Sequence, residues 1–449
     1  MSFPFIASAD EAQVRWLDQQ LQDFERWPLE RQRRQQAHSL AALFDGAHRH
    51  NAWWRARLDA AGHGSGQDAW QTLARLPALT RSDLQENFDA LSCAHAFAEG
   101  ACSEAHTTGS TGRPVTTLRH TESFRLRYMA LARRCSQWHG LDTGRALLRA
   151  TFHTEKDVLQ TSWGVPEAWF QPTGPMVLTP SLGRDPSHMH ALIQQHQVGY
   201  AVANASVLHA VARHALARQD PEPPRLHKML STGETVTPQV REDCRNAFGA
   251  EVVDRYSCVE VGWLAMQCAK HEHEHLHVLS PNVVVEIVDE AGQPCAPGQP
   301  GRVWVTALHS HAMPLIRYEI GDRAHWGAPC DCGLAYPVIG RLWGREREFI
   351  RTPDGTSSYV AVVAKDFLDI APIRDMRFRL YQGPLLRMEV VAAAALSAAQ
   401  RTALAAQMRQ MVGFDCPTEV AELPSIDWGA TDKRASFASV DRHWGGTPA

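Results

Sequence analysis

The sequence predicts an α/β protein with a large N-terminal unit of mixed β-sheets and helices, followed by a small α+β unit at the C-terminus. The chain of 449 residues is longer than one hydrophobic core usually serves. Between about residues 147 and 305, short β-rich runs mix with helical ones, which favours an α/β architecture. After about residue 344 the pattern becomes a compact β-β-α-β succession, long enough for a separate small domain. We therefore expect domains at residues 1–344 and 345–449.

Local signals place several elements of the N-terminal domain. Residues 1–100 are rich in helical patterns and are expected to form a helical leader. Thr80 is expected to cap a short helix, with Asp83 at its third position. Further along, Asn282–Asp289 and Gly301–Leu308 flank a turn rich in glycine and proline, which predicts two antiparallel strands.

The C-terminal domain is predicted from turn and capping signals. Its strands are expected at Met376–Gln382, Leu385–Ala393 and Thr418–Leu423. Ser397 and Gln400 form a capping box that begins a helix, and Gly413 is expected to end it.

Composition excludes several classes of protein. The 45 basic and 49 acidic residues give a net charge of −4 without long runs of either sign, which argues against nucleic acid as a main partner. No apolar stretch approaches the roughly 20 residues of a membrane span. The N-terminus lacks the pattern of a secretory signal, and ten cysteines are too sparse for a disulfide scaffold. We expect a cytoplasmic protein that does not bind the membrane.

The segment His106–Pro114 (HTTGSTGRP) carries the strongest chemical signal. Its glycines and hydroxyls allow the backbone to approach phosphate oxygens, and N–H groups in such a loop can cradle an anion. It is not a Walker loop, because only two residues separate the glycines and arginine follows the second. The alternative is an ordinary loop of glycine and threonine.

This loop resembles the phosphate-binding motif of adenylate-forming enzymes, which include acyl-CoA synthetases, adenylation domains and luciferases. Leu76–Leu84 (LPALTRSDL) resembles the segment that precedes it in the phenylacetate–CoA ligase branch and its deazaflavin-adenylating relatives. The resemblance implies ATP binding, with Arg113 as a catalytic cation where lysine is usual. The implied phosphate-binding residues are Thr107, Thr108, Gly109, Ser110, Thr111 and Gly112.

Three further segments resemble motifs of this superfamily in the expected order. They are Ser231–Glu234 (STGE), Asp254–Glu260 (DRYSCVE) and Arg317–Asp322 (RYEIGD). The resemblance places Gly233 and Glu234 beside the adenine and implies that Tyr256 stacks on it. It implies that Glu260 holds Mg²⁺, a hard cation that suits a carboxylate, and that Asp322 accepts hydrogen bonds from the ribose. Each segment alone would be a common turn or strand, so the shared order carries the interpretation.

Two segments near the C-terminal domain complete the resemblance. In Gly344–Glu348 (GRERE), Arg345 is implied to contact the nucleotide, and Arg347 stands at the domain pivot where aspartate is usual. In the segment GATDKR, Lys433 is implied to be the catalytic lysine that neutralises developing charge, although Asp432 replaces the usual glycine. The alternative for Lys433 is a solvated lysine.

A zinc site is expected from cysteine and histidine spacing. Cys330 and Cys332 follow a histidine-rich run, Cys268–His277, and thiolates and imidazoles are the ligands that Zn²⁺ prefers. Some members of the resembled branch carry a similar pattern, which implies Cys268, His277, Cys330 and Cys332 as structural ligands. The alternative is a strand whose four histidines alternate with glutamate on one exposed face.

The predicted activity is ATP-dependent conversion of a carboxylic acid to acyl-AMP, with transfer to a thiol and coenzyme A as the expected acceptor. The small domain is expected to rotate between the two half-reactions. Fourteen tryptophans, among them Trp163, Trp169 and Trp263, favour an aromatic acid.

Other acceptors and other classes of protein stay open. The acyl group could pass to a separate acyl carrier protein or to an amine. A kinase-like phosphotransferase is disfavoured by the missing Walker pattern, and a non-catalytic, zinc-containing nucleotide sensor is the non-enzyme alternative. The oligomeric state is left open, with a dimer as one option.

Overall fold

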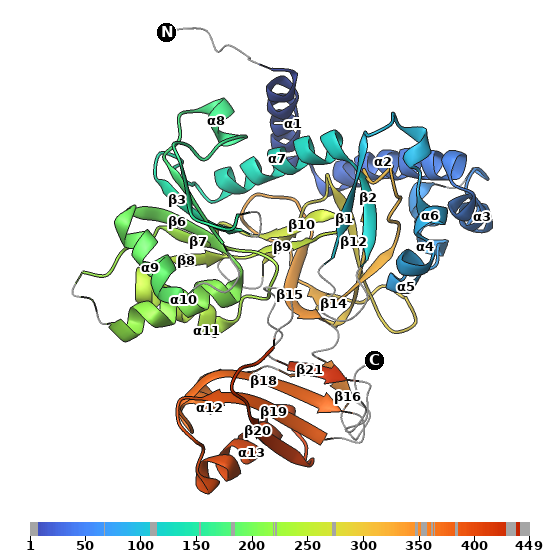
Figure 1. Cartoon of the computed structure of the whole chain (residues 1–449). Coiled ribbons are helices and arrows are strands. Elements are labelled where there is room, and N and C mark those ends of the chain that lie inside the picture. Colours follow the sequence, from blue (N-terminus) through green and yellow to red (C-terminus); the bar gives the residue numbers. More distant parts are fainter. Residues whose placement is uncertain are drawn as a thin grey trace. The chain divides into compact units, whose positions relative to one another are not determined.

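The chain divides into two compact units, Met1–Leu342 and Trp343–Ala449, each described below by itself (Figure 1). The structure is a computed structural model. It describes residues 8–66, 68–107, 115–151, 154–180, 185–218, 220, 222–271, 275–345, 349–351, 357–360, 362, 364–381, 385–427 and 437–440. Within these residues, no helix combines the length and the apolar content that a membrane span requires.

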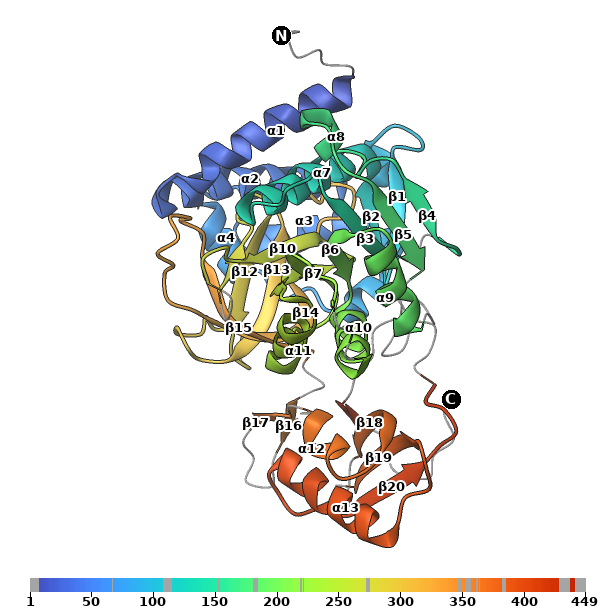
Figure 2. The ribbon, with the colours of Figure 1, turned by 90° about the vertical axis from the view of Figure 1, so that its left-hand side faces the viewer.

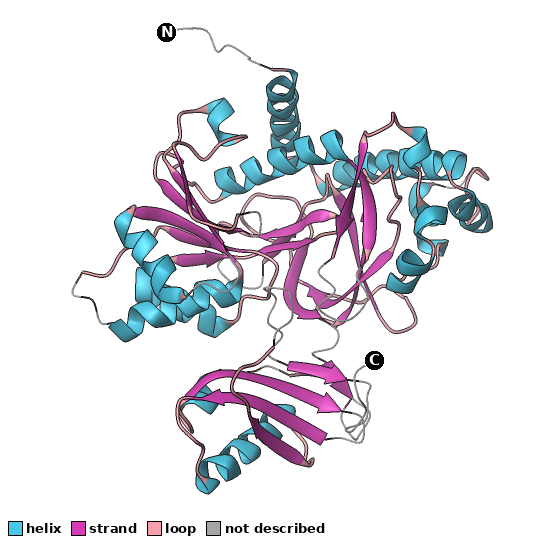
Figure 3. Ribbon diagram, in the orientation of Figure 1, coloured by secondary structure: helices cyan, strands magenta, loops and turns pink. Residues whose placement is uncertain are grey.

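Helices form the outer parts of the N-terminal unit (Figure 3). They are α1 (Ala9–Glu25), α2 (Leu29–His50), α3 (Ala52–Ala60), α4 (Ala69–Arg75), α5 (Arg81–Glu86), α6 (Phe88–Leu91), the 3₁₀ turn η1 (Ala94–Ala96), α7 (Thr121–Trp138), α8 (Glu167–Phe170), α9 (Pro186–Gln195), α10 (Ala205–Arg218) and α11 (Pro238–Phe248). The predicted helical leader is thus present. Thr80 and Asp83 form the predicted capping box at the start of α5.

A largely parallel sheet supports one half of this unit. Its spatial order is β4 (Val158–Gln160), β5 (Met176–Pro180), β3 (Ala146–Thr151), β6 (Val198–Ala203), β7 (Lys228–Ser231) and β8 (Glu251–Val253). All neighbours pair in parallel except β4, which runs antiparallel to β5. Because β5 and β6 lie on opposite sides of β3, the strand order reverses there, and ligands in α/β folds bind outside the carboxyl ends of strands at such a point.

Two apolar clusters cover the faces of this sheet. Leu148, Ala201 and Met229 pack with the apolar residues of α9, α10 and α11 on one face. Leu147 and Tyr200 pack with residues of α7 and β10 (Gly262–Gln267) on the other. Figure 1 shows α7 and the group α9–α11 on opposite sides, and Figure 2 shows α1 lying along α7. The sheet is therefore buried on both faces, as parallel sheets usually are.

An antiparallel sheet supports the other half of the unit. Its order is β12 (Val283–Val288), β13 (Gly301–Ala307), β14 (Tyr318–Trp326), β15 (Val338–Arg345), β11 (Leu276–Val278), β10 and β9 (Arg255–Cys258). The predicted antiparallel pair is confirmed, with Val283 opposite Ala307 and Val288 opposite Arg302. A separate pair, β1 (Cys102–His106) and β2 (Thr116–His120), flanks the predicted phosphate loop.

The histidine-rich run differs from the single strand with four histidines on one face, which was the alternative to the zinc site. In the described residues, β10 and β11 form an antiparallel pair, and only His277 of the four histidines lies on a strand. The physical reason is that the run contains the turn between β10 and β11, so the period of two does not extend through it.

The C-terminal unit is a four-stranded sheet with helices. The sheet order is β20 (Thr418–Glu422), β19 (Leu385–Ala392), β18 (Ile373–Tyr381) and β21 (Phe437–Val440). A short pair, β16 (Phe349–Arg351) and β17 (Ser357–Tyr359), and the helices α12 (Ala364–Leu368) and α13 (Ala398–Val412) complete it. The predicted capping box at Ser397 and the terminating Gly413, with φ of 80°, are both confirmed. Leu404 and Met408 of α13 pack on Phe378 and Met388 of the sheet.

Candidate functional site

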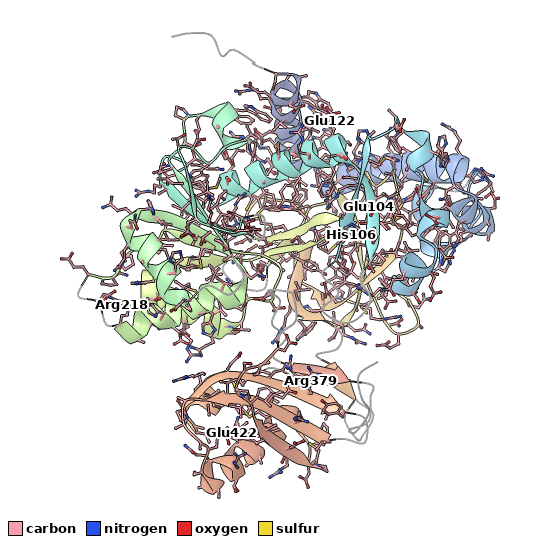
Figure 4. The ribbon with its side chains drawn as sticks, in the orientation of Figure 1. Glu104, His106, Glu122, Arg218, Arg379 and Glu422 are labelled. Carbon is pink, nitrogen blue, oxygen red and sulfur yellow. The ribbon has the colours of Figure 1, made fainter. Side chains whose placement is uncertain are left out.

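Thr107 closes the base of the predicted phosphate loop. Its N–H donates to the Val115 carbonyl at 2.9 Å, and its Oγ1 accepts from the Val115 N–H at 2.9 Å. Arg81 of α5 donates to the same hydroxyl at 3.5 Å. On β1, which leads into the loop, the side chains of His106 and Glu104 form an ion pair at 3.3 Å (Figure 4). The remaining predicted loop residues lie outside the described part of the chain: Thr108, Gly109, Ser110, Thr111, Gly112 and Arg113.

Two tyrosine–carboxylate pairs join two of the predicted motifs, Asp254–Glu260 and Arg317–Asp322. The Tyr256 hydroxyl donates to Asp322 Oδ2 at 2.8 Å, and both side chains are buried. The Tyr318 hydroxyl donates to Glu260 Oε1 at 3.0 Å. Burial, and secondarily the charge of Glu260, hold the pKa of Tyr318 well above its usual range, so this phenol keeps its proton and remains a donor. The pairs bring segments that are 66 and 58 positions apart into direct contact.

Arg317 ties the Leu76–Leu84 segment to β14. Its guanidinium pairs with Glu286 at 3.0 Å and donates to the carbonyls of Ala74 and Leu76. The backbones also bond, because Leu79 N–H donates to the Arg317 carbonyl and Glu319 N–H donates to the Leu79 carbonyl. Arg317 adopts a φ of 50°, which is uncommon for a residue with a side chain. Sequence reasoning gave no role to Arg317 or Tyr318, although the motif that contains both was the available signal.

The predicted adenine-side residues lie at the carboxyl edge of the parallel sheet. Ser231 is the last residue of β7, and Gly233 follows it with a φ of 77° that favours glycine. Glu234 accepts from the Ser206 N–H at 2.7 Å and from its hydroxyl at 3.1 Å, at the start of α10. A carboxylate there suits the positive end of the helix dipole.

Asp254 follows β8 at the same edge and is buried. Burial raises the pKa of its carboxyl to about 6, although Arg241 and Arg255 act in the opposite direction. The carboxyl ends of β7 and β8 therefore place the Ser231–Glu234 and Asp254–Glu260 motifs next to each other in space.

Three cysteines and one histidine converge at the β10–β11 hairpin. The donor atoms of Cys268, His277, Cys330 and Cys332 all lie within 4.8 Å of one another. Cys268 Sγ lies 3.6 Å from Cys330 Sγ, and Cys332 Sγ lies 3.2 Å from His277 Nε2. Two thiolates bound to zinc at about 2.3 Å in a tetrahedron would stand roughly 3.8 Å apart, so the donor set fits Zn²⁺.

Backbone amides support this cluster. The Lys270 N–H points at Cys268 Sγ at 3.3 Å, and the Leu334 N–H points at Cys332 Sγ at 3.5 Å. Both Cys268 and His277 are fully shielded from solvent. Amide donors of this kind favour the thiolate form that a metal requires.

The structure describes little at three of the predicted residues, Arg345, Arg347 and Lys433. Arg345 is the last residue of β15, and its side chain lies outside the described structure. Arg347 and Lys433 also lie outside the described residues.

Comparisons with known proteins agree with this geometry. The sequence profile of the AMP-binding enzyme family matches residues 105–310. The phenylacetate–coenzyme A ligase of Thermus thermophilus is 26% identical over 134 residues, and this match spans 29% of this chain and 30% of that ligase.

Solved structures share the fold over most of the chain. The crystal structure of 2-hydroxyisobutyryl-CoA ligase with 2-HIB-AMP, in the postadenylation state, is similar with a TM-score of 0.72 and 19% identity, covering 93% of this chain and 91% of that one. The same ligase with 2-HIB-AMP and CoA, in the thioesterification state, gives a TM-score of 0.61 at 21% identity with the same coverage. An anthranilate–CoA ligase with anthranoyl-AMP gives 0.52 at 13% identity, covering 72% of this chain and 64% of that one. Residues 105–310 thus match the AMP-binding enzyme family, and the Thermus phenylacetate–coenzyme A ligase is a distant relative of this chain.

Proposed function

We propose that this protein uses ATP to convert a carboxylic acid to acyl-AMP and then transfers the acyl group to coenzyme A. The observation that carries the proposal is the pair of contacts from Tyr256 to Asp322 and from Tyr318 to Glu260. They gather carboxylates from separate motifs near the carboxyl edge of a parallel sheet, where nucleotides bind in α/β folds. The likeness in fold to a ligase crystallised with an acyl-AMP and CoA supports the same chemistry.

In the first half-reaction, a carboxylate oxygen attacks the α-phosphorus of ATP, and the bond to pyrophosphate breaks. Glu260 would hold the Mg²⁺ that accompanies the phosphates, while Arg113 and Lys433 would neutralise the charge that develops in the transition state. Tyr256 would lie against the adenine, and Asp322 would accept hydrogen bonds from the ribose hydroxyls. The phosphate loop 107–112, with Gly233 and Glu234, would position the nucleotide.

In the second half-reaction, the thiol of coenzyme A attacks the acyl carbonyl and AMP leaves. We propose that residues 345–449 act as a mobile lid whose rotation about the Gly344–Arg347 region exchanges one half-reaction for the other. Arg345 would contact the nucleotide. Lys433 would act only in the first half-reaction, because its predicted role is at the α-phosphate.

We propose a structural Zn²⁺ ion at Cys268, His277, Cys330 and Cys332. Four protein ligands leave no open position, so the ion would not take part in catalysis. It would join the β10–β11 hairpin to the loop that precedes β15, a strand that pairs with β11. The ion would therefore stabilise the part of the fold that leads into Gly344.

The preference for an aromatic acid rests mainly on Trp263. Trp163 is buried and donates to the Arg145 carbonyl at the amino end of β3, and Trp169 packs with α1 and α7. Trp263, in contrast, contacts Tyr128 edge-on at 5.6 Å, and Tyr128 is 44% exposed. An accessible aromatic side chain against a buried one suits a flat apolar ligand.

Acid-dependent exchange of labelled pyrophosphate into ATP tests the first half-reaction. We expect exchange with at least one acid, a loss of about 100-fold in Glu260→Gln, and little change in Glu122→Gln, an exposed carboxylate at the start of α7. Lys433→Ala is expected to abolish exchange but to keep thioester formation from supplied acyl-AMP.

The other outcomes separate the alternatives. ATP binding without exchange for any acid would indicate a nucleotide sensor, and formation of ADP would indicate phosphotransfer. Acyl-AMP that coenzyme A does not consume would indicate a carrier protein or an amine as the acceptor. Full exchange by Lys433→Ala would remove Lys433 from the site.

A further inference from the structure

Arg149 lies where the core of the parallel sheet opens to solvent. It belongs to β3 near the carboxyl end, and alternation puts it on the same face as Leu147. Leu147 is buried against α7 and β10, whereas Arg149, two residues further, is exposed. Its neighbours in register are Leu178 on β5 and Val202 on β6, so an arginine interrupts an otherwise apolar face at the switch point of the sheet.

Tyr128 interacts with the charge of Arg149, and Trp263 packs in the same cluster as Leu147 and Val202. Phe124 and Tyr128, one turn apart on α7, have stacked rings 6.1 Å apart, and Tyr128 meets Trp263 edge-on. Gly262, with a φ of 89°, leaves room for Phe124, because a Cβ there would stand 3.2 Å from the ring. These residues form an aromatic wall with one exposed member, Tyr128.

In the described part of the chain, neither of the two positive charges at this wall, Arg149 and Arg255, forms an ion pair. Arg255 lies 5.5 Å over the Trp263 ring, and it donates to the carbonyls of Leu230 and Ser231, which carry no net charge. Within the described residues, Arg149 has no ion pair and no hydrogen bond from its guanidinium. Surrounding protein lowers the pKa of Arg149, and the charge of Arg255 lowers it further. The Arg149 side chain is therefore exposed to solvent, while protein atoms partly surround its guanidinium.

Two acids in this part of the fold already interact with arginines. Glu167, which like Arg255 lies near Cys135, pairs with Arg133 at 2.7 Å. Asp254 is buried and interacts with the charges of Arg241 and Arg255. Two arginines that repel each other beside an apolar wall are stabilised by a bound anion.

We infer that the acid activated by this enzyme is aromatic and carries a second anionic group, which binds Arg149 while its ring lies against Tyr128 and Trp263. This inference rests on the proposed adenylation activity and specifies its substrate class. Arg149 acts as a specificity residue and takes no part in the transfer of the acyl group. The second anion would form a charge-assisted hydrogen bond with the partly desolvated guanidinium, and such bonds are strong.

The test compares acids that differ only in the second group. Pyrophosphate exchange is measured with benzoate, the three benzenedicarboxylates and their monomethyl esters, and with phenylacetate, the phenylenediacetates and their monomethyl esters. We expect wild type to prefer at least one diacid over its monoester and its monoacid by about 10-fold or more in kcat/KM. Arg149→Met should lower kcat/KM for that diacid about 10- to 100-fold and change the monoacid little, with KM for ATP unaltered.

Two further variants control for folding and for net charge. Arg149→Lys should keep part of the preference, because it retains the charge without the planar fork. Arg145→Met removes the same charge immediately before β3, where Arg145 pairs with Asp142 at 3.2 Å, and should leave the preference intact. Melting temperatures of all variants establish that they fold.

The outcomes distinguish this inference from the activity on which it rests. If no acid supports exchange, the proposed function and the inference both fail. If monoacids are activated as well as diacids, or if Arg149→Met lowers activity equally for both, the inference fails while adenylation stands. An equal loss would indicate that Arg149 contacts the reacting carboxylate or the nucleotide.

Discussion

Replacing Arg317 with leucine should destabilise the N-terminal unit strongly. The change leaves Glu286 without its cation and removes the donor from the carbonyls of Ala74 and Leu76. The Arg317 side chain is 7% exposed and the Glu286 side chain 20%, so water can only partly replace the lost partner. Removing one member of a buried ion pair costs about 3–5 kcal/mol, and we expect the free energy of unfolding to fall by that amount.

Urea unfolding followed by tryptophan fluorescence measures this loss, and most of the tryptophans precede residue 343. The control is Arg34→Leu, because Arg34 pairs with Glu30 while both are highly exposed, and such pairs contribute about 0–1 kcal/mol. The double variant Arg317→Leu with Glu286→Leu should recover part of the loss, since no charge is then left unpaired.

The reasoning would be refuted if Arg317→Leu lowered the free energy of unfolding no more than Arg34→Leu. It would also be refuted if the double variant were less stable than Arg317→Leu by the full cost of a second independent substitution. The first result would mean that Arg317 does not hold the Leu76 segment. The second would mean that the loss arises from packing and not from the unpaired carboxylate of Glu286.

Three further predictions concern other parts of the site. Burial raises the pKa of Asp254 to about 6, so the stability that this carboxyl contributes is present below about pH 4 and falls by about 3 kcal/mol as the pH rises through 6. The free energy of unfolding of Asp254→Asn relative to wild type should therefore increase by that amount between pH 4 and pH 7 in urea unfolding. A difference that stays constant with pH would contradict this. Tyr318→Phe should weaken Mg²⁺ activation of pyrophosphate exchange about 10-fold, because Glu260 loses the donor that orients it, and an unchanged Mg²⁺ titration would argue against this role. Elemental analysis should find one zinc ion per chain in wild type and in Cys102→Ser but a large loss in Cys332→Ser, whereas zinc-free wild-type protein would exclude the site.

Structural features that depend on residues close together in the sequence, such as helix caps and hairpin pairs, were predictable. The capping boxes at Thr80 and Ser397 require residues only three positions apart, and the antiparallel pair β12–β13 requires one short connection. In these cases propensity, spacing and turn chemistry all act within a short segment. The structure confirms each of them with the expected partners.

Contacts between distant segments were not predictable in this way. Nothing in the spacing of Tyr256 and Asp322 indicates that a hydroxyl on β9 reaches a carboxylate on β14. Resemblance named both residues as ligands of the nucleotide, but it gave no reason for them to touch each other. Nothing in the sequence indicated a functional role for Arg149, because an arginine after Leu147 and Leu148 is typical of the polar end of a strand.

The histidine-rich run shows why periodicity alone could not choose a ligand. Alternation made His271, His273, His275 and His277 equivalent, since all four would share a face of one strand. Pairing of β10 with β11 removes this equivalence, because His277 lies on β11 opposite Met266 and is fully shielded from solvent. The information that separates the four residues is therefore tertiary.

The use of tyrosine beside the two carboxylates has a consequence for cation binding. A phenol with a raised pKa orients a carboxylate through one hydrogen bond and adds no opposing charge. An arginine in place of Tyr318 would hold Glu260 more strongly but would cancel the charge that a divalent cation needs. Arg317, the preceding residue, turns its guanidinium to Glu286 and to backbone carbonyls instead. The two adjacent residues thus have separate roles: the arginine stabilises the fold, and the tyrosine orients Glu260 for the proposed Mg²⁺ without adding a positive charge.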